Sequence, residues 1–438
     1  MNESWVRGDA TGLVFPAHPD ALRDSGIRFL GEAFRAWGVL GADNDVARID
    51  RFEEVGGGST GRKALMSVRY EKPHPGLATE LFVKFSRDLD DETRDAGRTQ
   101  MESEVRFAEL TRASGFPIAV PATQFADYHR DSGTGVLISE RIPFGTKGIE
   151  PQYLKCLDYE MPEQFEHYRA VVVSLARLAG AHRAGVLPAA LVDRFPVDLQ
   201  AATVGQRRVL TADQLDRKLA RLVDFIAEHP GLFPGSVGAP ELSGRLMREA
   251  HAVVAAEPAI WRLLAGATDH IALCHWNANV DNAWFWRDAD QTLRCGLMDW
   301  GCVSQMNVAM ALWGALSAAE TGLWNAHLDD LLRVFCAEVR GMGGPELDPD
   351  LLRPQLALYA VLMGVTWLLD VPARIRSRVP DLDGDTARTD PRIKGNEAVR
   401  APLQMLVNVL NVWGGFDIGE LVRRLAGHDR IAHTVHDS

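Results

Sequence analysis

The stretch from residue 271 to residue 303, IALCHWNANVDNAWFWRDADQTLRCGLMDWGCV, restricts the fold more than any other part of the chain. It opens on a four-residue apolar run, 271–274, whose length and flanks predict a short buried strand. Two further apolar runs, 283–286 and 293–298, lie on either side of a polar turn and predict a β-hairpin. The polar residues after each strand are therefore expected at strand ends.

These strand ends carry side chains suited to a hard cation. His275 and Asn277 follow the first strand, Asn282 precedes the hairpin, and Asp299 comes at its end. We expect the hairpin to bring the amide oxygen of Asn282 close to the carboxylate of Asp299. Magnesium takes one or two protein oxygens and completes its shell with water and phosphate oxygens. The sequence thus predicts a magnesium site at Asn282 and Asp299.

A glycine-rich turn follows the stretch 46–52 and precedes an alternating strand at 65–70. Without side chains in the way, the backbone N–H groups of such a turn can approach a phosphate closely. Taken alone this is a weak signal. The candidate phosphate contacts are Gly57, Gly58, Ser59 and Thr60.

The strand 81–85 holds a single lysine, Lys84, among apolar residues. An edge-strand lysine that faces water is the plain alternative. A helix follows at 101–110, and Glu104 is placed on it to face a preceding sheet. Glu102, two positions earlier, is the competing partner, and both glutamates can also be surface charges. The order resembles that of kinase-like folds, in which a strand lysine pairs with a helix glutamate so that the lysine's charge is held against nucleotide phosphates.

The order of these motifs resembles the aminoglycoside phosphotransferase and choline kinase branch of the kinase-like fold. The resemblance implies an α+β, bilobal protein with a small antiparallel-sheet lobe at 46–141 and a larger, mainly helical lobe at 142–438. Residues 1–45 are expected to form an N-terminal helical extension. In this family the pattern His-Gly-Asp is followed by Asn and, after a strand pair, by a second Asp.

Matched to that pattern, the chain departs at the catalytic acid, because Asn277 stands where the family has the Asp that accepts the substrate's proton. The resemblance implies ATP, or GTP, and Mg2+ as cofactors. It assigns catalytic roles to His275 and Asn277, with Asp281 as a substitute base; nucleotide contacts to Lys84, Glu104 and the backbone of Ser139, Glu140 and Arg141; and metal ligation to Asn282 and Asp299.

Three classes of function remain open. The first is an ATP- and magnesium-dependent phosphotransferase that moves a γ-phosphoryl group to a hydroxyl of a small molecule, slowed because asparagine cannot take up a proton. The second is a nucleotide-binding pseudokinase with a regulatory or binding role. The third is an unrelated activity on the same fold. No residue identifies the acceptor or the oligomeric state.

Composition limits the partners. The chain has 438 residues, 46% hydrophobic and 24% charged, with a net charge of −12, which argues against sequence-independent nucleic-acid binding. Its five cysteines show no paired spacing, so buried thiols in a reducing compartment are expected. No signal sequence or uncharged apolar run of membrane-spanning length is evident. A cytoplasmic protein with no membrane partner is the expectation.

Three further segments carry local predictions. Thr211 to Gln214 reads as a capping box that opens a helix to about Glu228. The apolar run 308–323 predicts a buried helix. The polar stretch 374–396 is either a lid or, more commonly for such a composition, a solvated loop.

Overall fold

The structure is a computed structural model that describes residues 4–56, 61–86, 94–202 and 209–425. The chain divides into two compact units. Unit 1 comprises 1–151, 185–196 and 296–304, and unit 2 comprises 152–184, 197–295 and 305–438. Gly57, Gly58, Ser59 and Thr60, the expected phosphate contacts, lie outside the described residues.

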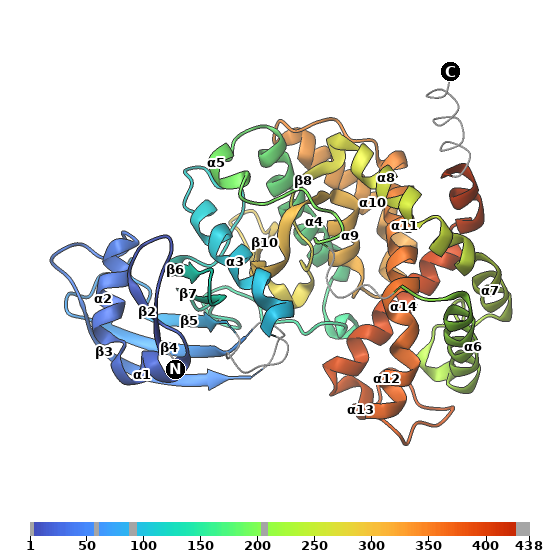
Figure 1. The fold of residues 1–438 in the computed structure, drawn as a ribbon, viewed down its shortest axis with the longest axis horizontal. Coiled ribbons are helices and arrows are strands. Elements are labelled where there is room, and N and C mark those ends of the chain that lie inside the picture. The colour runs from blue at the N-terminus through green and yellow to red at the C-terminus, as the bar shows by residue number, and fades with distance from the viewer. Residues whose placement is uncertain (1–3, 57–60, 87–93, 203–208, 426–438) are drawn as a thin grey trace. The chain divides into compact units, whose positions relative to one another are not determined.

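Unit 1 is built on a five-stranded antiparallel sheet (Figure 1). In spatial order its strands are β3 (Val46–Val55), β4 (Lys63–Tyr70), β5 (Glu80–Phe85), β7 (Thr134–Glu140) and β6 (Thr123–His129). Period-two alternation buries Ala64, Met66 and Val68 of β4 on one face. That face forms the hydrophobic core of unit 1, and the opposite face carries Lys63 and Leu65.

The first 45 residues contain strands as well as the expected helices. β1 (Trp5–Arg7) and β2 (Val14–Pro16) pair antiparallel, and α1 (Pro19–Ser25) and α2 (Ile27–Ala36) follow. Phe29, Leu30 and Phe34 of α2 are buried in the core of unit 1. This segment is therefore part of unit 1 and not a purely helical addition to it.

Asp127 of β6 ties the β1–β2 hairpin to the sheet. The Asp127 carboxylate accepts hydrogen bonds from the backbone N–H groups of Ala10 and Thr11, at 3.1 and 3.0 Å. Gly8 passes so close that a Cβ there would lie 2.0 Å from Asp127 Oδ2. The Asp127 side chain is fully buried, so these donors replace the water that its charge would otherwise bind.

Three further elements belong to unit 1. They are α3 (Arg94–Leu110), the four-residue α5 (Ala189–Val192) and the 3₁₀ turn η5 (Trp300–Cys302). α3 is the helix expected from the sequence to carry Glu104. α5 and η5 come from segments far along the chain, so unit 1 is complete only when residue 304 has been made.

Unit 2 is mainly helical (Figure 1). Its helices are α4 (Gln164–Arg183), α6 (Ala212–Glu228), α7 (Pro240–Ala255), α8 (Glu257–Gly266), α9 (Val308–Leu316), α10 (Thr321–Gly341), α11 (Pro349–Trp367), α12 (Val371–Arg378), α13 (Pro391–Lys394) and α14 (Glu397–Gly415). Short 3₁₀ turns lie between them: η1 (Asp158–Glu160), η2 (Pro230–Leu232), η3 (Thr268–His270), η4 (Val280–Asn282) and η6 (Leu368–Asp370). With the antiparallel sheet of unit 1, this confirms the expected α+β class.

The strands predicted from 271–303 are present. β8 (Ile271–His275) is buried along its whole length, and β9 (Ala283–Arg287) pairs with β10 (Leu293–Leu297) as the predicted hairpin. β8 pairs with β11 (Val303–Asn307), which was not predicted. His275, Asn277 and Asn282 are thereby held in unit 2, while Asp299 belongs to unit 1.

The local helix predictions are confirmed in one case and modified in another. α6 begins with the predicted capping box, in which Thr211 and Gln214 bond reciprocally. The apolar run 308–323 is not one helix, because α9 ends at Leu316 and α10 begins only at Thr321. Asn408 of α14 donates to the carbonyls of Ser317 and Ala319 in this break, which satisfies buried backbone groups there.

Within the part of the chain that the structure describes, one helical stretch, Pro349–Arg378, is long and apolar enough to span a membrane. Its most apolar window is 78% buried inside the structure, so these apolar side chains pack in the core of unit 2. Four of the cysteines, Cys156, Cys274, Cys295 and Cys336, are buried, in agreement with the sequence-based expectation.

The stretch 374–396 contains α13 and the end of α12.

Candidate functional site

Lys84 is the centre of the polar site in unit 1. It lies near the end of β5, directly opposite Lys63 of β4 and Leu137 of β7. Its side chain is only 2% exposed, so it is not a solvated edge lysine. A buried ammonium must be paired, because desolvation of an isolated charge is very costly.

Two carboxylates pair with Lys84. Its Nζ lies 2.6 Å from Glu104 Oε2 and 2.6 Å from Asp299 Oδ1. Burial alone would lower the pKa of Lys84, but the charges of Asp299 and then Glu104 outweigh it and raise that pKa. Lys84 is therefore an ammonium ion at neutral pH. Glu104, rather than Glu102, is its helix partner, as the sequence indicated.

Glu104 is also deeply buried, with 4% of the residue exposed. Burial raises the pKa of its carboxyl, and the charge of Lys84 opposes this. Its Oε2 lies within ion-pair distance of Lys84, but it accepts no properly directed hydrogen bond from any described residue. Glu104 thus contributes charge, whereas Asp299 accepts the directed hydrogen bond from Lys84.

Asp299 is held in an unusual backbone conformation. Its φ is +61°, in the left-handed region that few residues other than glycine and asparagine adopt readily. The side chain of the next residue, Trp300, stacks on Phe107 of α3, and the indole N–H donates to the carbonyl of Leu297. Trp300 therefore fixes the turn that points Asp299 at Lys84.

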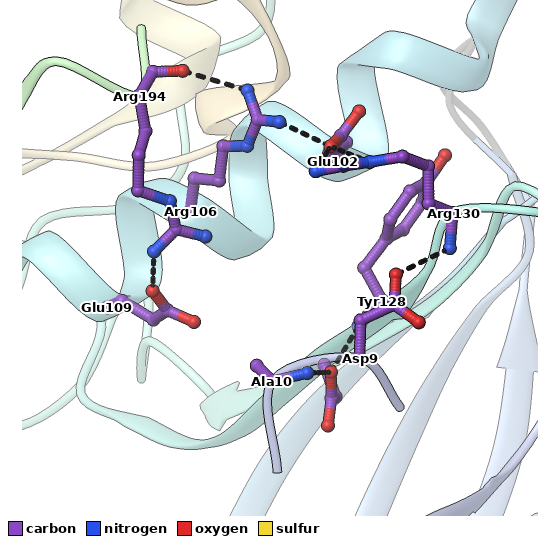
Figure 2. A network of polar contacts seen from close by, with 9 residues as sticks. Asp9, Ala10, Glu102, Arg106, Glu109, Tyr128, Arg130 and Arg194 are labelled. Carbon is purple, nitrogen blue, oxygen red and sulfur yellow. Dashed lines mark hydrogen bonds and ion pairs between the residues drawn. The ribbon is translucent and has the colours of Figure 1, made fainter. Parts of the chain in front are cut away.

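The outer face of α3 is held by a second set of ion pairs (Figure 2). Glu102 pairs with Arg106 on the same helix and with Arg130, which follows β6. Arg106 also donates to the carbonyl of Arg194, 2.8 Å away, and Arg194 pairs with Glu109. Arg130 is 70% exposed, so this single pair contributes little energy, but the connected set restrains the helix that presents Glu104.

The sheet face around Lys84 combines charge with apolar surface. Residues directly opposite on antiparallel strands share a face. Lys63, Lys84 and Leu137 form one cross-strand row on this face, and Leu65, Phe82 and Ser139 form the next. Leu65, Phe82 and Leu137 are only partly buried. The face thus offers a lysine row beside an apolar row, which suits a molecule with an anionic part and a flat apolar part.

The expected hinge contacts are partly engaged within the sheet. Ser139 and Glu140 end β7, and Arg141 follows it. The N–H of Glu140 donates to Ala122 and that of Arg141 donates to Glu80, each at 2.9 Å. These two N–H groups are therefore committed to the protein backbone and do not offer hydrogen bonds to a nucleobase.

In unit 2, the loop after β8 is organised by its own polar groups. The N–H of Asn277 donates to Nδ1 of the fully buried His275, at 3.2 Å. Asn282 donates through Nδ2 to the carbonyl of Asn277, at 2.9 Å. Because a carbonyl can only accept, this bond fixes the amide of Asn282 and leaves its Oδ1 for another partner, such as a metal ion.

The side chain of Asn277 is occupied on its oxygen side. Its Oδ1 accepts from Asn279 Nδ2 at 2.7 Å and from Lys155 Nζ at 3.4 Å. Lys155 lies far away in the sequence, in the segment before η1, and its Nζ is also 3.5 Å from Asp281 Oδ2. Asn277 and Asp281 are therefore joined through one lysine.

The position of Lys155 is set from two directions. Arg400 of α14 donates through Nε to the Lys155 carbonyl, at 2.9 Å, and Cys156 turns the chain with a φ of +59°. Burial lowers the pKa of Lys155, but the charge of Asp281 leads the opposing effects and the net pKa is raised. Lys155 is thus charged at neutral pH.

Asp281, the expected substitute base, is enclosed. Burial raises the pKa of its carboxyl against the lowering effect of Lys155. Its Oδ1 is buried and accepts no hydrogen bond from any residue the structure describes, and the same is true of Asn279 Oδ1. Across the described ranges, no three His, Cys, Asp or Glu side chains gather as metal ligands.

No known protein-family profile matches this chain, and no curated protein sequence matches it. Solved structures similar to this chain include small-molecule kinases and phosphotransferases. Choline kinase from Cryptosporidium parvum Iowa II is 10% identical, with a TM-score of 0.44, covering 92% of this chain and 96% of that chain.

Two other solved structures belong to the same two groups. The GDP complex of aminoglycoside 2'-phosphotransferase-IIIa is 14% identical, with a TM-score of 0.41, covering 83% of this chain and 94% of that chain. A choline/ethanolamine kinase family protein from Mesorhizobium loti is 15% identical, with a TM-score of 0.37, covering 86% and 98%. These are the groups that the sequence resembles.

Two residues important to these sites were missed from the sequence. Lys155 stands in a segment with no motif or periodicity, and only its contacts with Asn277 and Asp281 single it out. Trp300 directly follows Asp299 and carried no prediction of its own. An aromatic residue beside a strand-end acid, together with Phe107 three positions after Glu104, is the signal that could have indicated the stack.

Proposed function

We propose that this chain is an ATP- and magnesium-dependent phosphotransferase that acts on a small molecule. The observation that carries the proposal is the buried Lys84, held at 2.6 Å by both Glu104 and Asp299. A lysine fixed in this way by a helix glutamate presents a point charge to nucleotide phosphates. The half-buried row of Leu65 and Phe82 beside it suits the base of ATP or GTP.

In this proposal the catalytic work is mostly positioning and charge neutralisation, as phosphoryl transfer requires. Asp299 of unit 1 and Asn282 of unit 2 are the residues that would hold Mg2+, whose charge would offset that of the phosphates. His275 holds the backbone of Asn277 through the observed N–H bond. We place the reaction in the cytoplasm, where buried thiols stay reduced.

A nucleotide-binding pseudokinase is the second candidate, and one observation favours it. The only side-chain oxygen at position 277 already accepts from Asn279 and Lys155, and an amide cannot take up a proton at neutral pH. General-base assistance is typically worth about 10² to 10⁴ in rate, so its loss slows transfer to a hydroxyl strongly. Nucleotide binding without turnover is the outcome expected of this second candidate.

Calorimetric titration of ATP and GTP, with magnesium and then with chelator, tests the proposal. We expect magnesium-dependent binding that is at least 10-fold weaker in Lys84→Met and loses its magnesium dependence in Asp299→Asn. Lys72→Met is the matched control, because Lys72 lies in the same unit, paired with a single exposed aspartate, Asp43. Absence of nucleotide binding in a folded protein contradicts both candidates.

A further inference from the structure

The orientation of the Asn277 amide can be assigned from chemistry. Lys155 Nζ lies 3.4 Å from one terminal atom of that amide, and an ammonium group donates but never accepts. The atom facing Lys155 is therefore the oxygen. The same oxygen accepts from Asn279 Nδ2 at 2.7 Å, which agrees with this assignment. The other terminal atom of this amide, Nδ2, is therefore the donor.

That nitrogen is available to a ligand. It makes no hydrogen bond to any residue that the structure describes, and it is not among the buried unbonded atoms. Oδ1 of Asp281 and Oδ1 of Asn279, two acceptors in the same segment, are buried and accept no hydrogen bond from a described residue. At position 277 the loop therefore offers an N–H group that donates a hydrogen bond. A catalytic aspartate at the same position would offer a carboxylate that accepts one.

Lys155 adds to this donor character. It is charged, and its two polar contacts among the described residues are both long, at 3.4 and 3.5 Å. Good N–H···O bonds are about 2.7–3.2 Å, so the three donors of this ammonium are incompletely satisfied. Its place is nevertheless fixed, because Arg400 holds its backbone carbonyl. A fixed, largely buried and under-bonded ammonium next to an open amide N–H is a site for an oxyanion.

We propose that the acceptor of this phosphotransferase attacks through an oxygen that is already anionic, a carboxylate or phosphate oxygen, bound by Asn277 Nδ2 and Lys155 Nζ. The inference rests on the proposed function above. It explains position 277 as a specificity determinant and not as a lost base, because an oxyanion has no proton to give up. An aspartate at 277 repels such an acceptor, whereas an asparagine donates to it.

The reaction balances without a base. The anionic oxygen forms a bond to the γ-phosphorus of ATP, the bond from that phosphorus to the β–γ bridging oxygen breaks, and ADP leaves with the electron pair. ATP and a carboxylate give ADP and an acyl phosphate with no proton released. A hydroxyl acceptor, by contrast, releases one proton for each ADP formed at slightly alkaline pH. The two acceptor classes therefore differ in a measurable quantity.

The first test is binding of labelled inorganic phosphate and labelled acetate to the full chain, by equilibrium dialysis in the presence of a non-hydrolysable ATP analogue and magnesium. We expect saturable binding of at least one oxyanion, weakened 10-fold or more in Asn277→Asp and in Lys155→Met. Lys218→Met is the control, since Lys218 is also largely buried and paired with one aspartate, Asp370, but lies on α6. Equal binding in wild type and Asn277→Asp overturns the inference.

The second test is turnover of four acceptor pools: carboxylic acids, phosphomonoesters, neutral polyols and amino alcohols. ADP formation and proton release are followed together in weak buffer at pH 8. We expect ADP from one of the two oxyanion pools without stoichiometric protons, and a lower rate in Asn277→Asp. Phosphorus NMR distinguishes an acyl phosphate from a phosphoanhydride. Turnover confined to the hydroxyl pools, or faster in Asn277→Asp, contradicts the inference.

Failure of the inference and failure of the proposed function give different results. A protein that binds the ATP analogue but binds no oxyanion retains the proposed function and refutes the oxyanion site. A protein that binds no nucleotide refutes the proposed function. In that case oxyanion binding is measured on the protein without nucleotide. Binding that weakens in the Asn277 and Lys155 variants still supports the site, and binding that is unchanged in them refutes it.

Discussion

Trp300 stacks on Phe107 with their ring centroids 3.8 Å apart and their planes inclined by 19°. Phe107 stands one helical turn after Glu104, and Trp300 directly follows Asp299, so the stack joins the two elements that hold the carboxylates around Lys84. We expect Phe107→Ala to destabilise unit 1 by about 3–5 kcal/mol, as large core truncations do. We also expect the Phe107→Ala protein to bind ATP more weakly, by a larger factor than its smaller folded fraction accounts for.

Denaturant unfolding and calorimetry on the same protein check this prediction. Trp300→Phe is the control, because it keeps an aromatic face for Phe107 and removes only the indole hydrogen bond to Leu297. If Phe107→Ala loses stability but binds ATP as the wild type does, the stack serves packing alone.

Glu104→Gln tests the buried pair itself. Removing one charge leaves Lys84, among the residues that the structure describes, with the carboxylate of Asp299 alone, although its side chain is only 2% exposed. Breaking a buried pair by removal of one partner typically costs about 3–5 kcal/mol. Because Glu104 raises the pKa of Lys84, that pKa should fall in the variant.

This prediction is checked by measuring the free energy of unfolding of Glu104→Gln and of Glu102→Gln side by side at neutral pH. Glu102 lies on the same helix and pairs with the more exposed Arg130, so its loss should cost less than 1 kcal/mol. Equal losses in the two variants would falsify the assignment of Glu104 as the essential partner.

Asp158 predicts how stability depends on pH. Burial raises the pKa of its carboxyl from the ordinary 3.8 to about 7, against the lowering effect of the Tyr168 hydroxyl. The folded protein keeps this proton up to about pH 7, whereas the unfolded chain releases it near pH 4. The contribution to the free energy of unfolding therefore falls between these values, by at most about 4 kcal/mol at 1.36 kcal/mol per pKa unit.

Asp158→Asn should remove this slope. The amide oxygen still accepts from Tyr168, whose hydroxyl lies 2.5 Å from Asp158 Oδ2, and no buried charge forms at pH 8. We expect a higher melting temperature than wild type at pH 8 and a smaller difference at pH 4, measured by calorimetry. A wild-type melting temperature that rises steadily from pH 4 to pH 7 in parallel with the variant contradicts the raised pKa.

Asp127→Ala should release the N-terminal hairpin. The lost bonds from Ala10 and Thr11 go to a buried charge, and such bonds are worth about 1.5–3 kcal/mol each. Limited proteolysis should then cut within residues 5–16 before the sheet unfolds. Asp43→Ala, which removes an exposed aspartate paired with Lys72, should leave the cleavage pattern unchanged. An uncut hairpin in Asp127→Ala means that packing of Phe15 alone holds it.

Sequence patterns predicted the elements whose signals are local. The strand 271–275, the hairpin after it and the capping box at Thr211 each depend on residues within a few positions of one another. The Lys84 and Glu104 pair was predictable because a strand lysine and a helix glutamate follow in a fixed order. Whether Asn282 and Asp299 share a metal ion stays a prediction.

The features that were missed depend on contacts between distant segments. Lys155 precedes Asn277 by 122 positions. The hydrophobic pattern of neither segment predicts the contact between these two side chains. The break between α9 and α10 at 317–320 depends on Asn408, which donates a hydrogen bond to a backbone carbonyl that the interrupted helix leaves without a helical partner. The strands of the β1–β2 hairpin are too short to be predicted from their sequence. The hairpin is held by Asp127, whose carboxylate accepts hydrogen bonds from two of its backbone N–H groups.

Unit 1 is discontinuous, since the segment 296–304 joins a sheet that is otherwise finished by residue 151. On a ribosome that adds 5–20 residues per second, the chain between these points takes roughly 7 to 30 s to emerge. During that time Lys84 has its helix partner Glu104 but not Asp299, and Phe107 has the edge-on ring of Phe116 but not the stacked ring of Trp300. The nascent sheet is therefore exposed to chaperones until one short turn arrives, and this turn also carries the acid expected to bind the metal.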